Sequence, residues 1–173
     1  PTEAQWEWAA SGPVKRRYPW GNDWDRTKCD NAEYWYQAPI GDLETIEKWK
    51  TSAGFKRGPD GGWSILCSDV VRLLKPVGSF STGVSWCGAL DMAGNVMEWC
   101  ADWYDATYYC KSPSVDPTGP TSGDKRVLKG GGWSMPPVFC RTANRRSAAP
   151  AVSNSMIGFR VCLVPPATGA GAR

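Results

Sequence analysis

The stretch LDMAGNVMEW, residues 90–99, decides the fold of this chain of 173 residues. A tight glycine-containing turn leads directly into a short strand-like run, with the carboxylates Asp91 and Glu98 on either side of the turn. Turn and strand are each only a few residues long. Such a unit predicts small sheets embedded in loops, since it leaves no room for long regular strands.

Elements of the same short kind are expected on both sides of this stretch. Thr2 and Gln5 form a capping box that opens a short helix, which the Gly-Pro pair at residues 12–13 ends. A second helix is expected over residues 42–50, with Asp42 as its cap. The apolar residues that support these helices are Trp6, Ala9, Ala10, Leu43, Ile46 and Trp49. The strand-like runs are residues 63–66, 72–74, 96–99, 126–129 and 158–164. Together these elements predict an α+β domain with small antiparallel sheets.

The composition indicates an irregular interior rich in indole. The chain has 11 Trp, and a buried indole packs well only where its N–H finds an acceptor. The 19 Gly and 14 Pro interrupt long helices and wide sheets. Because the length is that of one domain, we expect a single loop-rich core in which backbone carbonyls accept from the indoles.

Charge and hydropathy argue against two classes of partner. The net charge is +3, with acidic and basic residues mixed along the chain, whereas a nucleic-acid interface needs clustered Lys and Arg. The basic run at residues 15–17 is interpreted as a solvated loop. No apolar run approaches the roughly 20 residues of a membrane helix. We therefore expect neither nucleic-acid binding nor membrane insertion.

The absence of histidine removes the common catalytic arrangements. Ser/His/Asp and Cys/His pairs cannot form, and the seven cysteines contain no CxxC pair for a zinc site. The odd number leaves at least one thiol free or paired between chains. Asp102 and Asp105 are interpreted as solvated turn residues. The glycines at 130–132 lack the Lys-Ser/Thr of a phosphate loop and indicate close backbone approach beside Trp133.

Four segments in the same order resemble the formylglycine-generating enzyme (sulfatase-modifying factor) family. They are PTEAQWEWAA (1–10), YPWGN (18–22), LDMAGNVMEW (90–99), and RVLKGGGW (126–133) together with IGFRV (157–161). The resemblance spans nearly the whole chain. It implies the variant C-type-lectin fold of that family over residues 1–164. The Pro-, Ala- and Gly-rich tail, residues 165–173, is expected to be disordered.

The resemblance also implies that the catalytic residues are missing. Catalytic members use two copper-binding cysteines, the second within an Arg-Cys-Ala-x-Arg pattern. Here residues 141–145 read RTANR, so Thr142 takes the place of that cysteine, and the partner position falls at Pro137. A hydroxyl cannot replace a thiolate as a soft Cu(I) ligand, and the iron-dependent branch of the superfamily needs His. We expect no enzyme activity and no copper; the alternative is an oxidase that pairs Cys140 with Cys162.

Two structural calcium sites are further implied by the resemblance, since Ca²⁺ takes oxygen ligands from carboxylates and carbonyls. The ligands of the first would be the side chains of Asp91 and Glu98 and the carbonyls of Gly94 and Val96. Those of the second would be Asn31, the carbonyl of Ala32, Asp69 and the carbonyl of Val71. The alternative for the first site is that its carboxylates only accept backbone hydrogen bonds in the turn.

The segment of residues 134–156, called here the display segment, differs from its surroundings. Its ends match the family, but small and apolar residues fill what we expect to be exposed loop. This resembles the variable proteins of diversity-generating retroelements, which present a mutated C-terminal region on this fold. Exposed apolar residues in one patch usually mark a binding site. The candidate contact residues are Ser134, Met135, Val138, Phe139, Asn144, Arg146, Ser147, Ala151, Ser153, Asn154 and Met156.

Three functions follow from this reading. The first is a non-catalytic module that binds a protein or glycan ligand on a target surface, as a retroelement variable protein or a receptor-binding protein of a virion or cell surface does. The second is the copper- and cysteine-dependent oxidase. The third is a regulatory sensor domain of a larger protein, because this fold is also found on bacterial kinases. For the display segment, the alternative is ordinary loop with Val138 and Phe139 buried.

Overall fold

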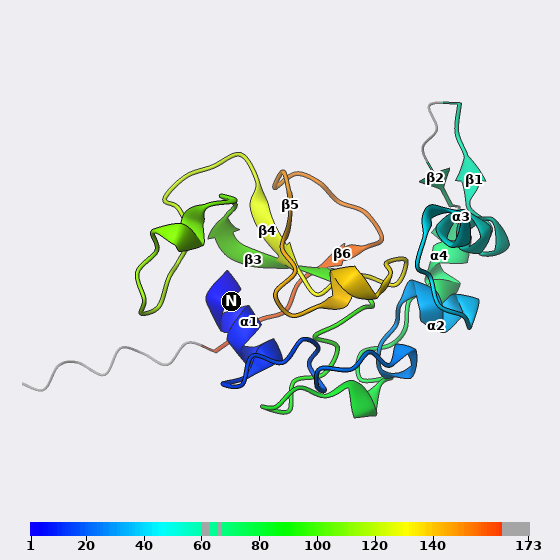
Figure 1. Ribbon diagram of the computed structural model, residues 1–173. Coiled ribbons are helices and arrows are strands. Elements are labelled where there is room, and N and C mark those ends of the chain that lie inside the picture. The colour runs from blue at the N-terminus through cyan, green and yellow to red at the C-terminus, as the bar shows by residue number, and fades with distance from the viewer. Residues whose placement is uncertain (60–62, 66, 164–173) are drawn as a thin grey trace, which may run out of the picture.

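The computed structural model describes residues 1–59, 63–65 and 67–163 (Figure 1). It is an α+β domain in which short elements are joined by long loops, as the sequence predicts. The predicted disorder of residues 165–173 lies outside the described residues. The helices are α1 (Glu3–Ser11), α2 (Ala32–Tyr36), α3 (Leu43–Ser52) and α4 (Cys67–Leu73), with 3-10 turns η1 (Arg26–Lys28), η2 (Ser81–Gly83), η3 (Tyr108–Cys110) and η4 (Pro137–Cys140). The strands are β1 (Lys56–Arg57), β2 (Trp63–Ser64), β3 (Met97–Trp103), β4 (Arg126–Lys129), β5 (Arg146–Ala148) and β6 (Ile157–Gly158).

A sheet of order β5–β4–β3–β6 lies at the centre of the domain, beside α1 (Figure 1). The neighbours β5–β4 and β4–β3 are antiparallel, whereas β6 runs parallel to β3 with Ile157 opposite Met97. The expected antiparallel pairing is confirmed for β1–β2, β4–β3 and β5–β4, and β6 departs from it. The long connections between β3 and β6 give the chain room to return in the same direction. The hairpin β1–β2 forms a separate small sheet that lies with α3 and α4 to one side.

Both predicted helices are confirmed, each with its cap. Thr2 Oγ1 accepts from the Gln5 backbone at 3.2 Å while Gln5 Oε1 accepts from the Thr2 backbone at 3.0 Å, and Asp42 caps α3 in the same reciprocal way with Thr45. Leu43 does not support its helix as expected, because it is 80% exposed in the first turn of α3. None of the helices in the described residues has the length and apolarity needed to cross a membrane.

Two predicted strands are wrong in part or in whole. Residues 72 and 73 belong to helix α4, because Val70, Leu73 and Leu74 recur at helical spacing and pack into one apolar cluster. Of residues 158–164, only Gly158 joins the sheet; residues 159–163 carry no strand pairing, and residue 164 lies outside the described residues. Local alternation of apolar residues does not reveal where a strand loses its neighbour.

The core is built on indoles, as the composition predicts. Trp6 packs between α1 and the sheet, and Trp49 and Trp133 pack together beside the helices. Most indole N–H groups find acceptors: Trp6 donates to Glu98, Trp133 to the Ser155 carbonyl, and others to Asp23, Glu33, Asp30 and Trp8. Among the described residues, Trp49 is the buried indole that has no acceptor.

Removing the cap of α1 is expected to destabilise the domain modestly. Thr2→Ala leaves the Gln5 N–H without its side-chain acceptor, so the free energy of unfolding should fall by about 1 kcal/mol in a urea titration. Thr121→Ala, at an exposed position, is the matched control and should leave the midpoint unchanged. Equal midpoints for the two variants would show that the capping box does not stabilise α1.

Candidate functional site

Thr142, the residue predicted to take the place of the second catalytic cysteine, is buried and hydrogen-bonded to the backbone. It is 3% exposed; its backbone N–H donates to the Arg17 carbonyl at 2.9 Å and its hydroxyl to the Arg16 carbonyl at 2.6 Å. Pro137, predicted to take the partner position, begins η4 and offers no side-chain ligand. Thr142 therefore holds the display segment against residues 16–17 through these two hydrogen bonds.

Cys140 and Cys162 have opposite environments. Cys140 is fully buried and packs with Cys29 and Ala93, whereas Cys162 is exposed near the end of the described chain. Within the described residues, the apolar cluster around Cys140 does not include Cys162. The two thiols that the oxidase alternative names thus lie one in the core and one at the surface.

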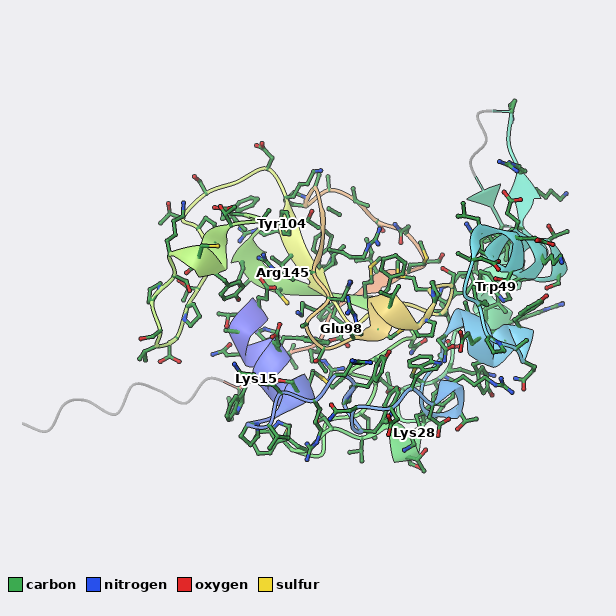
Figure 2. The ribbon with its side chains drawn as sticks, in the orientation of Figure 1. Lys15, Lys28, Trp49, Glu98, Tyr104 and Arg145 are labelled. Atoms are coloured by element: carbon green, nitrogen blue, oxygen red, sulfur yellow. The ribbon has the colours of Figure 1, made fainter. Side chains whose placement is uncertain are left out.

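A buried network of ion pairs connects the display segment to α1 and β4. Arg145 forms a two-pronged contact with Glu3, Nε to Oε1 at 2.6 Å and Nη2 to Oε2 at 2.9 Å. The Arg145 guanidinium lies over the rings of Tyr104 and Tyr109; Arg145 and Tyr104 are labelled in Figure 2. Lys129, fully buried, extends the network from β4: its Nζ is 3.8 Å from Glu3 and donates to Glu7 at 2.8 Å. These contacts join α1, β4 and the start of β5.

Asp102 belongs to this network, so its interpretation as a solvated turn residue is wrong. It lies in β3, is 1% exposed, and accepts from the Glu3 backbone at 2.7 Å. Burial raises the pKa of the Asp102 carboxyl, and the nearby Glu3 carboxylate raises it further against the lowering effect of the hydrogen bond. Asp105 follows the strand in a turn as expected, where hydrogen bonds from Thr107 lower its pKa.

The predicted contact residues divide by exposure. Met135 is only 9% exposed and packs with Met97 and Leu128, so its predicted place on a contact surface is wrong. The Met135 backbone is tied to Gly132 and Ala32 in a tight turn that directs the side chain inward. The half-buried residues are Ser134, Phe139, Asn144, Ser147 and Met156. The exposed residues are Val138, Arg146, Ala151, Ser153 and Asn154.

Part of the exposed set forms one surface at η4 and β5. Val138 is 47% exposed, and the Arg146 guanidinium lies over the Phe139 ring, 4.8 Å from its centroid. The half-buried residues have internal partners: the Ser134 hydroxyl contacts Met156 Sδ at 2.7 Å, and Met156 packs against two core clusters. An apolar patch with a cation above it is suited to contact with a protein partner.

The first predicted calcium set comes together around one cavity of about 410 Å³. Asp91, Gly94, Val96 and Glu98 all line it, in a turn whose residues Asp91 and Gly94 have positive φ. Gly94 is required, because a Cβ there would lie 2.1 Å from the Asp30 carbonyl oxygen. The turn thus packs closely against the backbone of Asp30.

These groups fit a hard cation in kind, although Glu98 has other partners. Its carboxylate accepts from Trp6 at 2.6 Å and from Arg160 at 2.5 and 2.6 Å. Asp91 Oδ2 accepts from the Gly78 backbone at 2.6 Å, and Oδ1 has no partner among the described residues. Two carboxylates with nearby carbonyls make an all-oxygen donor set. No three His, Cys, Asp or Glu side chains converge anywhere in the described residues, this cavity included.

The second predicted set has no comparable arrangement. Asn31 caps α2 by accepting from Tyr34 at 3.0 Å, and its amide nitrogen donates to the carbonyls of Arg26 and Cys29. Ala32 and Val71 contribute backbone in α2 and α4, and the side chain of Asp69 lies outside the described residues. With the Asn31 side chain engaged on both sides, this site stays a prediction.

One cavity was missed by the sequence analysis. Residues 20–28, with Glu33 and Pro39, line a hollow of about 670 Å³. Trp20 and Trp24 form its aromatic wall. Trp20 stacks on Tyr18 at a centroid distance of 5.5 Å, and Trp24 is tilted against Tyr18 at 5.0 Å and against Trp20 at 5.8 Å. In the sequence, residues 18–22 served only as one segment of the family resemblance. Two Trp flanking Asp23 in a turn are the signal that could have pointed to a surface hollow.

The family-model comparison covers nearly the whole chain. The model of the sulfatase-modifying factor enzyme 1-like domain matches residues 1–164. The chain belongs to this family. The resemblance carried by the four sequence segments is thereby confirmed, together with the α+β fold of a sulfatase-modifying factor domain.

The relatives of this sulfatase-modifying factor domain include an enzyme, a protein kinase and a variable protein. The domain is 37% identical to the formylglycine-generating enzyme of Streptomyces coelicolor, over 92% of this chain and 45% of the relative. It is 33% identical to the serine/threonine-protein kinase Pkn1 of Chlamydia trachomatis, over 92% of this chain and 20% of the kinase. Treponema denticola variable protein 1 superposes with a TM-score of 0.54 at 27% identity, covering 92% of this chain and 45% of that protein. The chain spans at most about half the length of these relatives.

Proposed function

We propose that this domain is a non-catalytic binding module that presents the display segment to a protein or glycan ligand on a target surface. The observation that carries the proposal is the burial of Thr142 with its hydroxyl donated to the Arg16 carbonyl. The position that would hold a copper-binding thiolate holds a structural hydrogen bond, and Pro137 offers no second ligand. The domain therefore uses the family scaffold without the family's copper site.

The structure supports display by separating scaffold from surface. Glu3, Lys129 and Arg145 anchor the segment beneath β5, while Val138 and Arg146 project from it. A packed core fixed by other residues can tolerate changes at such exposed positions. The similarity to Treponema denticola variable protein 1 supports the same reading, including a diversified segment. A reverse-transcriptase gene nearby, with a near-repeat of the coding sequence for residues 133–160, would decide that point.

Because the core is fixed by other residues, substitutions at the exposed positions of the display segment should leave the stability of the domain nearly unchanged. A quadruple variant, Val138→Ser, Arg146→Gln, Ala151→Ser and Ser153→Ala, should keep Tm within a few degrees of the parent, because exposed substitutions rarely cost more than about 0.5 kcal/mol each. The matched control within the same segment is Met135→Ser, which should lower Tm by roughly 5–10 °C because it leaves a polar cavity in the core. If the surface variant lost as much stability as the control, the proposal that the scaffold carries the display segment without needing its exposed residues would be wrong.

A second candidate, a regulatory domain, is favoured by the 33% identity to Pkn1 over 92% of this chain. Under this proposal the same surface contacts a neighbouring domain of one polypeptide. Reading the full gene distinguishes the two: an in-frame kinase domain supports regulation, and its absence favours display.

We also propose a structural Ca²⁺ at the cavity lined by residues 91–98, where Asp91 and Glu98 would hold the ion with backbone carbonyls. Bound there, the ion would brace the turn before β3. Addition of a chelator should lower Tm, and Asp91→Asn, which keeps an acceptor for the Gly78 N–H, should abolish that shift. Asp23→Asn, at an exposed position, should retain the shift. An unchanged Tm on chelation of the parent would contradict calcium at this site.

A further inference from the structure

The six cysteines whose side chains the structure describes are all free thiols, and two of them lie together. Cys29 and Cys140 are 2% and 0% exposed and pack in one buried cluster with Ala93. Cys100 is buried in a different cluster, against Trp6 and Val127. The others, Cys87, Cys110 and Cys162, are exposed.

The packing fixes both sulfurs in place. Asn31 Nδ2 lies 3.4 Å from Cys29 Sγ, and the Asn31 side chain is itself held by its cap on α2. On the other side, a Cβ at Gly131 would lie 2.9 Å from Cys140 Sγ. Gly131 has φ of 70° and leaves the space that the Cys140 sulfur occupies. Asn31 therefore contacts the Cys29 sulfur, and the Gly131 backbone lies close to the Cys140 sulfur.

We propose that Cys29 and Cys140 form an oxidation site, at which the two thiols join in a disulfide when the chain folds in the presence of a low-molecular-weight disulfide. In the reaction, one cysteine thiolate attacks the disulfide of oxidised glutathione and releases one reduced glutathione. The second cysteine thiolate then attacks the mixed disulfide and releases the other. Two protein thiols are oxidised and one glutathione disulfide is reduced to two thiols, so electrons and protons balance.

The burial of the pair determines when the reaction occurs. Removal from water, helped by the neighbouring Cys140 thiol, raises the pKa of Cys29 well above its ordinary value. Because only the thiolate attacks a disulfide, the folded dithiol reacts slowly. The bond therefore forms during folding, while both sulfurs still reach the reagent, and is then protected by the core.

The cross-link would join two parts of the chain that are far apart in sequence. Cys29 directly follows η1, and Cys140 is the last residue of η4 in the display segment. Closing so long a loop restricts the unfolded chain strongly, which stabilises the folded state. The inference stands on the packing of the two thiols alone and is independent of any binding function.

The test is a peptide map after refolding. Reduced, denatured protein is refolded in a glutathione redox buffer or in dithiothreitol, free thiols are blocked with N-ethylmaleimide, and disulfides are located by mass spectrometry. The expected result is a Cys29–Cys140 cross-link in the glutathione sample and a Tm higher by roughly 10 °C than in dithiothreitol. Finding both residues alkylated, or either joined to another cysteine, would overturn the proposal.

Variants separate this pair from the other thiols. Cys140→Ala should lose the Tm difference between the two refolding conditions, whereas Cys100→Ala, a matched buried substitution, should retain it. A variant with Ser at positions 87, 110 and 162 should also keep the cross-link, since the exposed thiols are not needed. If an alanine variant fails to fold, the peptide map of the unmodified chain still decides the question.

Discussion

Arg145→Met is expected to lower the free energy of unfolding by about 3 kcal/mol, because the substitution leaves the Glu3 carboxylate buried without its main partner. Glu3 is 1% exposed, and Arg145 contacts both of its oxygens. Lys129, 3.8 Å away, already donates to Glu7 and cannot replace the two-pronged contact. Methionine keeps much of the apolar part of the arginine side chain, so the loss of stability reports mainly on the missing charge. Denaturant unfolding measures the difference in the free energy of unfolding.

The double variant Glu3→Gln with Arg145→Met provides the matched comparison. It removes both charges, so it should be more stable than Arg145→Met alone. Arg141→Met, at an exposed position, should change stability by no more than about 0.5 kcal/mol. If the double variant were no more stable than the single one, the ion pair would not be the reason for the loss.

Raising the pH from about 5 to 8 is expected to lower the free energy of unfolding by about 2–3 kcal/mol through Asp30 alone. Burial raises the pKa of the Asp30 carboxyl from 3.8 to about 7, against the lowering effect of the hydrogen bond from Trp35 at 2.6 Å. The carboxyl is fully buried, and Oδ2 has no partner among the described residues. Since the folded state favours the protonated form, this stability is present below pH 3.8 and is lost as the pH rises through about 7.

The prediction is tested by thermal or urea unfolding at several pH values, with a chelator present so that metal binding does not contribute. Asp30→Asn should flatten the dependence between pH 5 and 8. Asp124→Asn, which is exposed, should leave the dependence as in the parent. A parent protein that becomes more stable towards pH 8 would contradict a raised pKa at Asp30.

The sequence predicted those parts of the fold that local chemistry determines. The Thr2 and Asp42 caps and the strand at residues 126–129 depend on neighbours a few residues away, and all are confirmed. The run at residues 72–74 was misread because Val70 and Leu73, which share a helical face, were not considered together. The parallel partner of β3 comes from about 60 residues later, which no local pattern reveals.

In the candidate site, too, the features that the sequence did not predict depend on contacts between residues far apart in the chain. Thr142 could be placed at the catalytic position from the sequence, but its burial depends on the carbonyls of Arg16 and Arg17. Met135 and Val138 are both apolar residues of one loop, yet only Val138 is exposed, because a backbone turn directs Met135 inward. The pairing of Glu3 with Arg145 joins residues 142 apart in sequence and could not be predicted from either residue alone.

The absence of copper-dependent catalysis is tested most directly by a turnover measurement. The reduced domain is supplied with Cu(I), oxygen and a cysteine-containing peptide that a formylglycine-generating enzyme converts, with that enzyme as positive control, and the peptide is analysed by mass spectrometry. The account predicts no aldehyde product, from either the parent chain or Cys140→Ser. Aldehyde formation by the parent that disappears in Cys140→Ser would contradict it.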